Sequence, residues 1–260
     1  MTDDPYAPIS DIYDFSYEDF DDDVDFYDNL ARSVDGAVLE LGVGTGRVAL
    51  PLARRGHEVV GIDTSASMLD VAQAQLKTMR LRKGSLLLLD ADMTNFDLNR
   101  KFGLVFAAAN TFQHMLTTRE QLICLQRVAA HVAPGGVFAM SIRSPVSVDW
   151  DEGGVPAPLL LDWVRDEPAT GARVMKLVAA QAEPERMVRR MTYVYDRVFP
   201  DGTVRRSVFV TDLRYSTEAE IRLLLQQVGL RVTHVYGDYD LSPVGQGDNL
   251  VFVARAEGSR

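Results

Sequence analysis

The chain has 260 residues and a formal net charge of −10, and its length suits one large α/β domain with an elaboration. It contains no apolar run long enough to span a bilayer, and it opens with acids rather than with a basic and then apolar leader. We therefore expect a cytoplasmic protein that does not bind membranes. The single cysteine, Cys124, excludes an internal disulfide and is expected to be a free thiol in a helix core.

The first 28 residues carry eleven acids and no Lys or Arg, while the rest of the chain is close to neutral. Acid beside a ligand cleft would repel a phosphate backbone, so nucleic acid is not an expected partner. Seven aromatic residues between positions 6 and 27 are too many for a disordered tail, and we expect this segment to pack against the core. Asp21 or Asp22 can cap a helix that ends near Val34.

The next segment combines a buried strand at 37–41, a glycine turn and a second strand that ends at Asp63. Gly42, Gly44 and Gly46 allow the backbone to approach a ligand, because no side chain blocks it. A helix at 47–55 would direct its N-terminal amides at an anion, and the Asp63 carboxylate could accept hydrogen bonds from both hydroxyls of a ribose. The sequence therefore predicts a site for a nucleotide-type cofactor.

Alternating elements continue after this unit. We expect helices at 65–80, with Thr64 or Ser65 as the cap, and at 117–132, a buried strand at 86–89, and strands at 104–109 and 137–142, the last introduced by the turn Pro134-Gly135-Gly136. This spacing predicts a doubly wound α/β fold with a mostly parallel sheet.

The pattern changes after Ser144. A loop with Pro145, Trp150, Gly153, Gly154, Pro156 and Pro158 precedes strands at 172–182, 187–199 and 203–214, which predict an antiparallel meander inserted as a lid. A helix at 217–228, ended by Gly229, and strands at 230–236 and 250–254 complete the core. The expected organisation is an arm with the first helix at 1–35, a cofactor-binding core at 36–144, the lid at 145–215 and the end of the core at 216–260.

Spacing distinguishes between cofactors. A dinucleotide fingerprint needs a small residue where this chain has Arg47, which argues against a nicotinamide-dependent reductase. The pattern Glu40-x-Gly42-x-Gly44-x-Gly46 instead resembles the first motif of class I S-adenosylmethionine-dependent methyltransferases, and Asp63 resembles the second. The resemblance implies a seven-stranded Rossmann-like sheet, with the glycine turn beside the methionine part of the cofactor and Asp63 on its ribose.

Further residues follow from this resemblance. Asp92 and Met93 would meet the adenine, and Met68 would cover it, although ordinary helix packing explains Met68 equally well. The charge of Arg47 and its nearness to the glycine turn suggest a partner for the cofactor carboxylate. The backbone of Ala109 or Asn110 would hold the methionine end, and His114 would act as a base or orient the acceptor.

The region around Tyr13, together with the inserted meander, resembles the small-molecule branch that includes glycine, sarcosine and amino-sugar N-methyltransferases. In that branch the arm and the meander cover the substrate, which implies that Tyr13 lies near the cofactor. Tyr193, Tyr195 and Arg197 alternate along one strand and so share one face, and the resemblance suggests that this face covers the substrate.

The expected reaction is methyl transfer from S-adenosylmethionine to a nitrogen or oxygen of a small molecule, leaving S-adenosylhomocysteine. A reductase, or a cofactor-binding regulator without activity, remains an alternative. A macromolecular acceptor is disfavoured because no basic stripe is evident. No ligand spacing for a metal is present, and the sequence leaves a homo-oligomer open.

Overall fold

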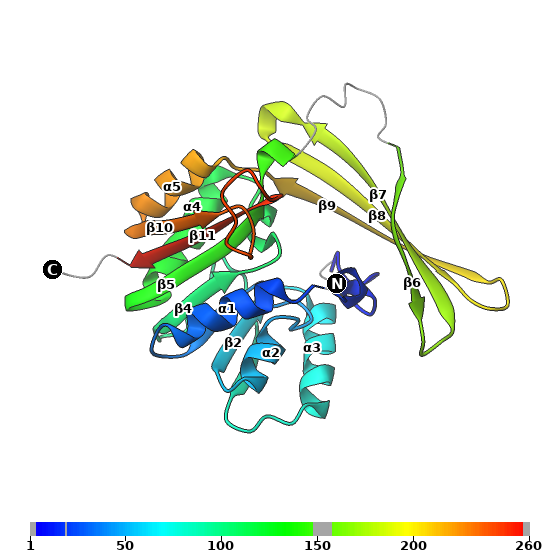
Figure 1. Ribbon diagram of the computed structural model, residues 1–260, viewed down its shortest axis with the longest axis horizontal. Coiled ribbons are helices and arrows are strands. Elements are labelled where there is room, and N and C mark those ends of the chain that lie inside the picture. Colours follow the sequence, from blue (N-terminus) through cyan, green and yellow to red (C-terminus); the bar gives the residue numbers. More distant parts are fainter. Residues whose placement is uncertain (1–3, 19, 148–157, 257–260) are drawn as a thin grey trace.

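The computed structural model describes residues 4–18, 20–147 and 158–256 (Figure 1). Its helices are α1 Asp22–Arg32, α2 Ala49–Arg54, α3 Ala66–Thr78, α4 Thr118–His131 and α5 Glu218–Gln227. Short 3₁₀ helices are η1 Tyr13–Tyr17, η2 Thr111–His114, η3 Pro145–Ser147 and η4 Pro184–Arg186. The core strands are β1 Val38–Leu41, β2 Glu58–Asp63, β3 Ser85–Asp90, β4 Phe102–Ala107, β5 Val132–Arg143, β10 Leu230–Tyr236 and β11 Asn249–Ala256.

These core strands form one seven-stranded sheet in the order β10-β11-β5-β4-β1-β2-β3. Neighbours from β5 to β3 are parallel, whereas β11 is antiparallel to both β5 and β10. The prediction of a doubly wound, mostly parallel sheet is confirmed. From β1 the chain adds β2 and β3 on one side, and then returns to add β4 and β5 on the other side. Such a switch point, here between β1 and β4, opens a crevice at the carboxyl ends of the strands.

Helices cover both faces of the sheet. On one face α1 and α2 pack over a cluster that includes Tyr27, Leu52 and Phe106, and on the other face α4 and α5 pack over a cluster that includes Leu125, Phe138 and Leu225. Thr117 and Thr217 each form a capping box that starts α4 and α5, and Ser65 caps α3 as expected. Cys124 is fully buried in α4, and burial raises the pKa of its thiol to about 12.

Three details differ from the predictions. The strand expected to be buried at 86–89 is the edge strand β3, and its Leu87 is 54% exposed. The fifth strand begins at Val132 rather than after the Pro134-Gly135-Gly136 turn, with an irregular register opposite Phe102 and Leu104. Asp21 holds the N-cap position of α1, but its side chain makes no capping hydrogen bond.

The inserted region is a second, four-stranded antiparallel sheet, which we call the lid sheet. Its strands follow chain order: β6 Leu160–Glu167, β7 Ala172–Glu183, β8 Val188–Val198 and β9 Val204–Arg214. The meander is confirmed, but β6 was not predicted. Trp150, Gly153, Gly154 and Pro156 of the expected loop lie outside the described residues.

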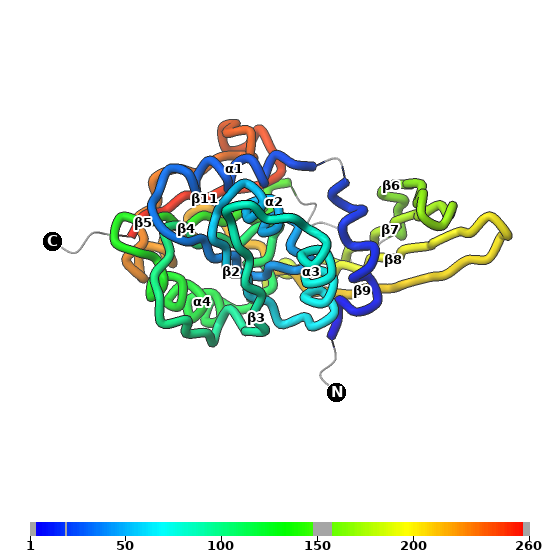
Figure 2. The backbone as a smooth tube through the Cα atoms, turned by 90° about the horizontal axis from the view of Figure 1, so that it is seen from below, coloured from blue at the N-terminus to red at the C-terminus, as the bar shows by residue number. Residues whose placement is uncertain are grey.

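Residues 4–18, which we call the arm, lie between the core and the lid sheet in both views (Figures 1 and 2). The Asp14 carboxylate accepts hydrogen bonds from the Thr45 hydroxyl (2.6 Å) and the Gln75 amide (3.1 Å), which join the arm to the core. The arm also contacts the lid sheet, where the Arg197 guanidinium lies 3.2 Å from the Asp11 carboxylate. The arm is therefore packed, as its aromatic content predicted.

Candidate functional site

A cavity of about 490 Å³ opens at the carboxyl ends of the central strands, and we call it the strand-end cavity. Ligand pockets for molecules of cofactor size are commonly ~300–1,000 Å³. Its lining comprises Asp4, Pro5, Tyr6, Tyr13, Gly42, Gly44, Ile62, Asp63, Thr64, Ser65, Ala66, Met68, Asp90, Ala91, Asp92, Met93, Ala109, Thr111, His114 and Met115. Most residues expected to bind a cofactor are therefore brought together here.

The glycine turn provides the cavity's backbone wall. Gly42 and Gly44 have φ values of +64° and +53°, a region that favours glycine. A Cβ on Gly42 would lie 2.4 Å from the Thr111 methyl group, so the turn and η2 pack too closely for any side chain there. A Cβ on Gly44 would meet only the Met68 methyl group, at 3.6 Å.

Asp63 connects the glycine turn to the start of α3 through its two carboxylate oxygens. One carboxylate oxygen accepts a hydrogen bond from the Gly44 N–H at 2.7 Å, and the other accepts from the Ser65 N–H at 2.8 Å. Burial raises the pKa of this carboxyl. Each carboxylate oxygen has a second acceptor site, so Asp63 can hold the turn and still bind a ligand's hydroxyl groups.

The rest of the lining combines apolar and acidic groups. Met68 and Met93 contribute apolar side chains, and Met68 also belongs to the buried core. The Asp92 carboxylate accepts hydrogen bonds from the backbone and the hydroxyl of Thr94, both through one oxygen. Apolar side chains and a carboxylate in the same lining suit an adenine with its amino group.

Ala109 and Asn110 follow β4 and both adopt left-handed backbone conformations, with φ values of +50° and +66°. Two such residues in succession are strained in the absence of glycine and are typical of functional sites. The N–H of Thr111 bonds to the Ala108 carbonyl at 3.0 Å and so closes this turn. Ala109 lines the strand-end cavity, while Asn110 lines the neighbouring one.

That neighbouring cavity, of about 100 Å³, lies between the arm, η2 and the lid sheet, and we call it the lid cavity. It is lined by Tyr6, Ile9, Tyr13, Ser16, Tyr17, Ala109, Asn110, His114, Lys176, Tyr193, Tyr195, Phe209, Thr211 and Leu213. Four of these residues, Tyr6, Tyr13, Ala109 and His114, also line the strand-end cavity. The two cavities therefore share a wall.

His114 stands in this shared wall and joins three parts of the protein. Its Nε2 lies 2.9 Å from the Tyr6 hydroxyl of the arm, and its Nδ1 lies 3.3 Å from the Thr211 hydroxyl of β9. Burial lowers the pKa of the imidazole to about 4, so His114 is neutral at pH 7. One ring nitrogen then donates a hydrogen bond while the other accepts.

The tyrosines expected over the substrate lie around the lid cavity. Tyr13 contacts Tyr6 edge to face, with ring centroids 6.2 Å apart, and Tyr193 stacks on Phe209 at 5.8 Å. Burial raises the pKa of Tyr195 to about 12 and also raises that of Tyr13, so both hydroxyls stay protonated. Arg197, on the same face of β8, pairs instead with Glu167 at 2.9 Å and does not line the cavity.

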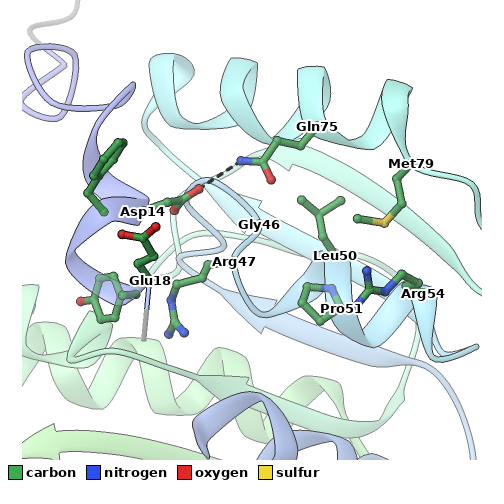
Figure 3. Close-up of a pocket in the computed structure, with 11 residues that line it drawn as sticks. Asp14, Glu18, Gly46, Arg47, Leu50, Pro51, Arg54, Gln75 and Met79 are labelled. Atoms are coloured by element: carbon green, nitrogen blue, oxygen red, sulfur yellow. Dashed lines mark hydrogen bonds between the residues drawn. The ribbon is translucent and has the colours of Figure 1, made fainter. Parts of the chain in front are cut away.

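Arg47 and Glu40 flank the glycine turn in sequence, but neither lines the strand-end cavity. The Arg47 guanidinium makes a two-pronged ion pair with Asp23 of α1 and lies 4.3 Å from the Tyr17 ring centroid. Arg47 and Gly46 line a third cavity, of about 390 Å³, on the outer side of the turn (Figure 3). Glu40 is 2% exposed, and its Oε2 has no hydrogen-bond partner among the described residues. Burial raises the pKa of Glu40 well above its usual range.

The donors and walls of the strand-end cavity fit S-adenosylmethionine. The cavity offers an open backbone wall at the glycine turn, the Asp63 acceptors and the apolar Met68 and Met93 side chains. Three residues of this region were missed from the sequence: Tyr6, Asp23 and Lys176. Lys176 alone had a signal, because it interrupts apolar residues in the strand Val174-Met175-Lys176-Leu177-Val178.

The other three histidines do not line the two cavities and make packing or hydrogen-bond contacts elsewhere. His57 lies 2.7 Å from the buried Asp28 carboxylate, His131 lies between Leu98 and Arg127, and His234 stacks on Tyr236. Within residues 4–18, 20–147 and 158–256, no three His, Cys, Asp or Glu side chains gather as metal ligands. In the same ranges, no helix is both long and apolar enough to cross a membrane.

Comparison with known proteins gives consistent relatives. A family model described as a methyltransferase domain matches residues 38–136. The chain is 28% identical over 213 residues to the cypemycin N-terminal methyltransferase of a Streptomyces species. This alignment covers 82% of this chain and 80% of that protein. Six other curated relatives, all methyltransferases by name, are matched over 38–60% of their own length.

Solved structures extend the likeness to nearly the whole chain. The CcbJ methyltransferase of Streptomyces caelestis aligns with a TM-score of 0.78 and 26% identity, over 98% of this chain and 97% of that one. CalS10, an amino pentose methyltransferase from Micromonospora echinaspora solved with S-adenosylmethionine bound, aligns with a TM-score of 0.72 and 24% identity, over 95% and 97% of the two chains. The latter likeness concerns the fold.

Proposed function

We propose that this chain, which belongs to the class I S-adenosylmethionine-dependent methyltransferases, methylates an amine nitrogen of a small molecule held in the lid cavity. The observation that carries the proposal is the wall shared by the two cavities. Tyr6, Tyr13, Ala109 and His114 line both cavities, so a cofactor in one and an acceptor in the other would meet at these residues.

The cofactor supplies a methyl group activated by a positively charged sulfur. In this proposal Asp63 binds the ribose, Asp92 and Met93 meet the adenine, Met68 covers it, and the Gly42 and Gly44 backbone borders the methionine chain. Arg47 would reach the cofactor carboxylate only by giving up part of its pairing with Asp23. We therefore assign Arg47 to holding α1 against the glycine turn, beside the buried Glu40, whose pKa is raised by burial.

The surroundings of His114 favour a nitrogen over an oxygen as the acceptor atom. A hydroxyl acceptor needs a general base whose pKa is near the operating pH, and the pKa of His114 is about 4. An amine in its neutral form already carries a free lone pair. Among the described residues, no Asp or Glu lines the lid cavity, so no carboxylate there stabilises the protonated amine.

Catalysis would then depend on positioning. The acceptor nitrogen would take the methyl group in exchange for the bond to the cofactor's sulfur, and the methylated ammonium would lose its proton to solvent once the products leave. His114 and Tyr6 would orient the nitrogen, while Tyr13, Tyr193 and Tyr195 exclude water. Orientation of two bound reactants can supply ~7–11 kcal/mol of a reaction barrier.

The test follows label from methyl-labelled S-adenosylmethionine into a metabolite extract. We expect labelled amines. Labelling confined to hydroxyl groups would reject the nitrogen assignment, and tight S-adenosylhomocysteine binding without any labelled product would favour a regulator. Calorimetry with S-adenosylhomocysteine and NADH separates the reductase alternative, which predicts binding of NADH alone.

Two variants test the residue roles. Asp63→Ala should weaken S-adenosylhomocysteine binding by about fivefold to 150-fold, since ~1–3 kcal/mol is typical for losing a buried hydrogen-bond partner. His114→Gln keeps a polar side chain and should lower turnover by less than about tenfold, whereas loss of a general base typically costs ~10²–10⁴-fold. A loss in that larger range would restore His114 as the base.

A further inference from the structure

A defect in the lid sheet lies beside the lid cavity. Strand β6 pairs with β7 through Leu161 opposite Leu177 and Trp163 opposite Lys176, so Asp162 has no partner of its own and forms a β-bulge. A bulge redirects a side chain, and bulges are frequent near active sites. Here the Asp162 carboxylate reaches the Lys176 ammonium, with 2.9 Å between Oδ2 and Nζ.

Lys176 is the better buried partner of this pair. Its side chain is 13% exposed, against 44% for Asp162, and its ammonium lies 5.1 Å from the centroid of the Tyr193 ring. Lys176 lines the lid cavity, but Asp162 does not. The Lys176 ammonium therefore lies beside the ring of Tyr193, which also lines the cavity, while its counter-ion is the more exposed partner of the pair.

The rest of the lining points to the same kind of ligand. The described lining contains hydroxyl groups of Tyr, Ser and Thr, the amide of Asn110, one ammonium and a neutral imidazole, and no Asp or Glu. Such a set of donors favours an anion and disfavours a second cation. Lys176 is also absent from the wall that the lid cavity shares with the strand-end cavity.

We propose that Lys176 anchors an acidic group of the acceptor, a carboxylate or a phosphate, and that this group replaces Asp162 as the partner of the ammonium. The proposal rests on the proposed function and deepens it, because the acceptor becomes an amine that also bears an acid. The acid binds at the Lys176 end of the lid cavity, and the amine points to His114 and the methyl group.

The exchange of partners makes the anchoring physically reasonable. Removing a lone ammonium from water is costly, and Asp162 keeps Lys176 paired when no acceptor is bound. Asp162 is exposed enough to turn into water once another anion arrives. One carboxylate then substitutes for another, and no buried charge is left alone.

Lysine NMR tests the proposal directly, because the chain has four lysines, at positions 77, 83, 101 and 176. The protein is labelled with ¹³C at lysine Cε and saturated with S-adenosylhomocysteine. It is then titrated with β-alanine, which bears a carboxylate, with O-phosphoethanolamine, which bears a phosphate, or with ethanolamine, a control amine without an acidic group. Lys176→Met assigns the signal by removing it. We expect a saturable shift of the Lys176 signal with one or both acid-bearing probes, and none with ethanolamine.

The two acidic probes distinguish a carboxylate from a phosphate. No shift with either probe up to its solubility limit, or an equal shift with ethanolamine, would overturn the proposal. The lysine at 101 is an internal control, since its signal should stay fixed in every titration. Absence of methyl transfer would count against the proposed function but would leave this binding measurement readable.

Asp162→Asn tests the exchange itself. Removing the competing carboxylate should tighten binding of the effective probe by roughly threefold to tenfold, the range expected for a partly exposed ion pair of about 1 kcal/mol. Lys176→Arg, measured by calorimetry, should retain most of the affinity that Lys176→Met loses. Unchanged or weaker binding in Asp162→Asn would show that Asp162 does not compete for Lys176.

Discussion

Gly42 combines a left-handed backbone with a close contact to Thr111, and Gly42→Ala tests both. The added Cβ must push Thr111 aside while the backbone is strained, so we expect a loss of ~2–4 kcal/mol in the free energy of unfolding. S-adenosylhomocysteine affinity should fall more than tenfold, because the turn borders the strand-end cavity. Urea unfolding and calorimetry measure the two effects.

Gly202→Ala is the matched control. Gly202 also has a positive φ, +85°, but a Cβ there would meet nothing within 4 Å. This variant should lose only about 1 kcal/mol from strain and keep its cofactor affinity. Equal losses in the two variants would mean that the contact with Thr111 is unimportant.

The buried imidazole of His114 makes stability depend on pH. The pKa of His114 is about 4 in the folded protein and about 6.5 when unfolded, so the unfolded chain binds the proton first as pH falls. This contribution is present above pH 6.5, is lost as pH falls from 6.5 to 4, and amounts to at most about 3 kcal/mol.

His114→Gln isolates this contribution from other titrating groups. The free energy of unfolding is measured for the wild type and for the variant at pH 7.5 and at pH 5. The wild type should exceed the variant by a larger amount at pH 7.5 than at pH 5. The Tyr6 and Thr211 hydroxyls face the ring and stay uncharged, so they do not alter the sign. A difference that is constant with pH would contradict the assignment.

At the scale of elements, α1 is tied to the core by ion pairs of very different burial. Asp23 is fully buried and faces Arg47, whereas Asp25 is 65% exposed and faces Arg55 at 2.7 Å. Asp23→Asn leaves the Arg47 charge without its partner and should lower the free energy of unfolding by ~3–5 kcal/mol. Asp25→Asn should cost less than about 1 kcal/mol. Denaturant unfolding of the pair distinguishes them, and similar losses would argue against a buried charge pair.

Elements with strong periodic or capping signals were predictable from sequence. Strand β10 was predicted with its observed bounds, and Thr217 marked the start of α5. Strand β6 was missed because the Asp162 bulge breaks the alternation that identifies a strand. The apolar run of β3 was read as buried, since composition does not tell a central strand from an edge strand.

Some residues of the candidate site could be identified from sequence motifs, and others only from the packed fold. Gly42, Asp63 and Asp92 could be predicted because motif spacing ties them to strand ends. Asp23 could not be singled out among eleven acids, since its burial depends on Arg47, which is distant in sequence. Lys176 had a signal as a charge within an apolar strand, but its place beside the arm becomes evident only when the lid sheet is packed.

At the scale of the whole molecule, cofactor binding should stabilise the folded state, because the strand-end cavity is assembled from several elements. At about 100 times its dissociation constant, S-adenosylhomocysteine adds roughly 2.7 kcal/mol, which corresponds to a rise of ~5–10 °C in Tm for a chain of this size. NADH should leave Tm unchanged. Differential scanning calorimetry measures both, and a shift with NADH alone would contradict the cofactor assignment.

The position of the arm has a practical consequence. Asp4 borders the strand-end cavity and bonds to Ser65 and Ser67, whereas β11 ends on the far side of the core (Figure 1). A fluorophore attached at position 4 would therefore sit beside the cavity and compete with ligands for space. The same label attached at position 256 would be remote from it, so position 4 suits an environment-sensitive dye and position 256 suits a label that must not disturb ligand binding.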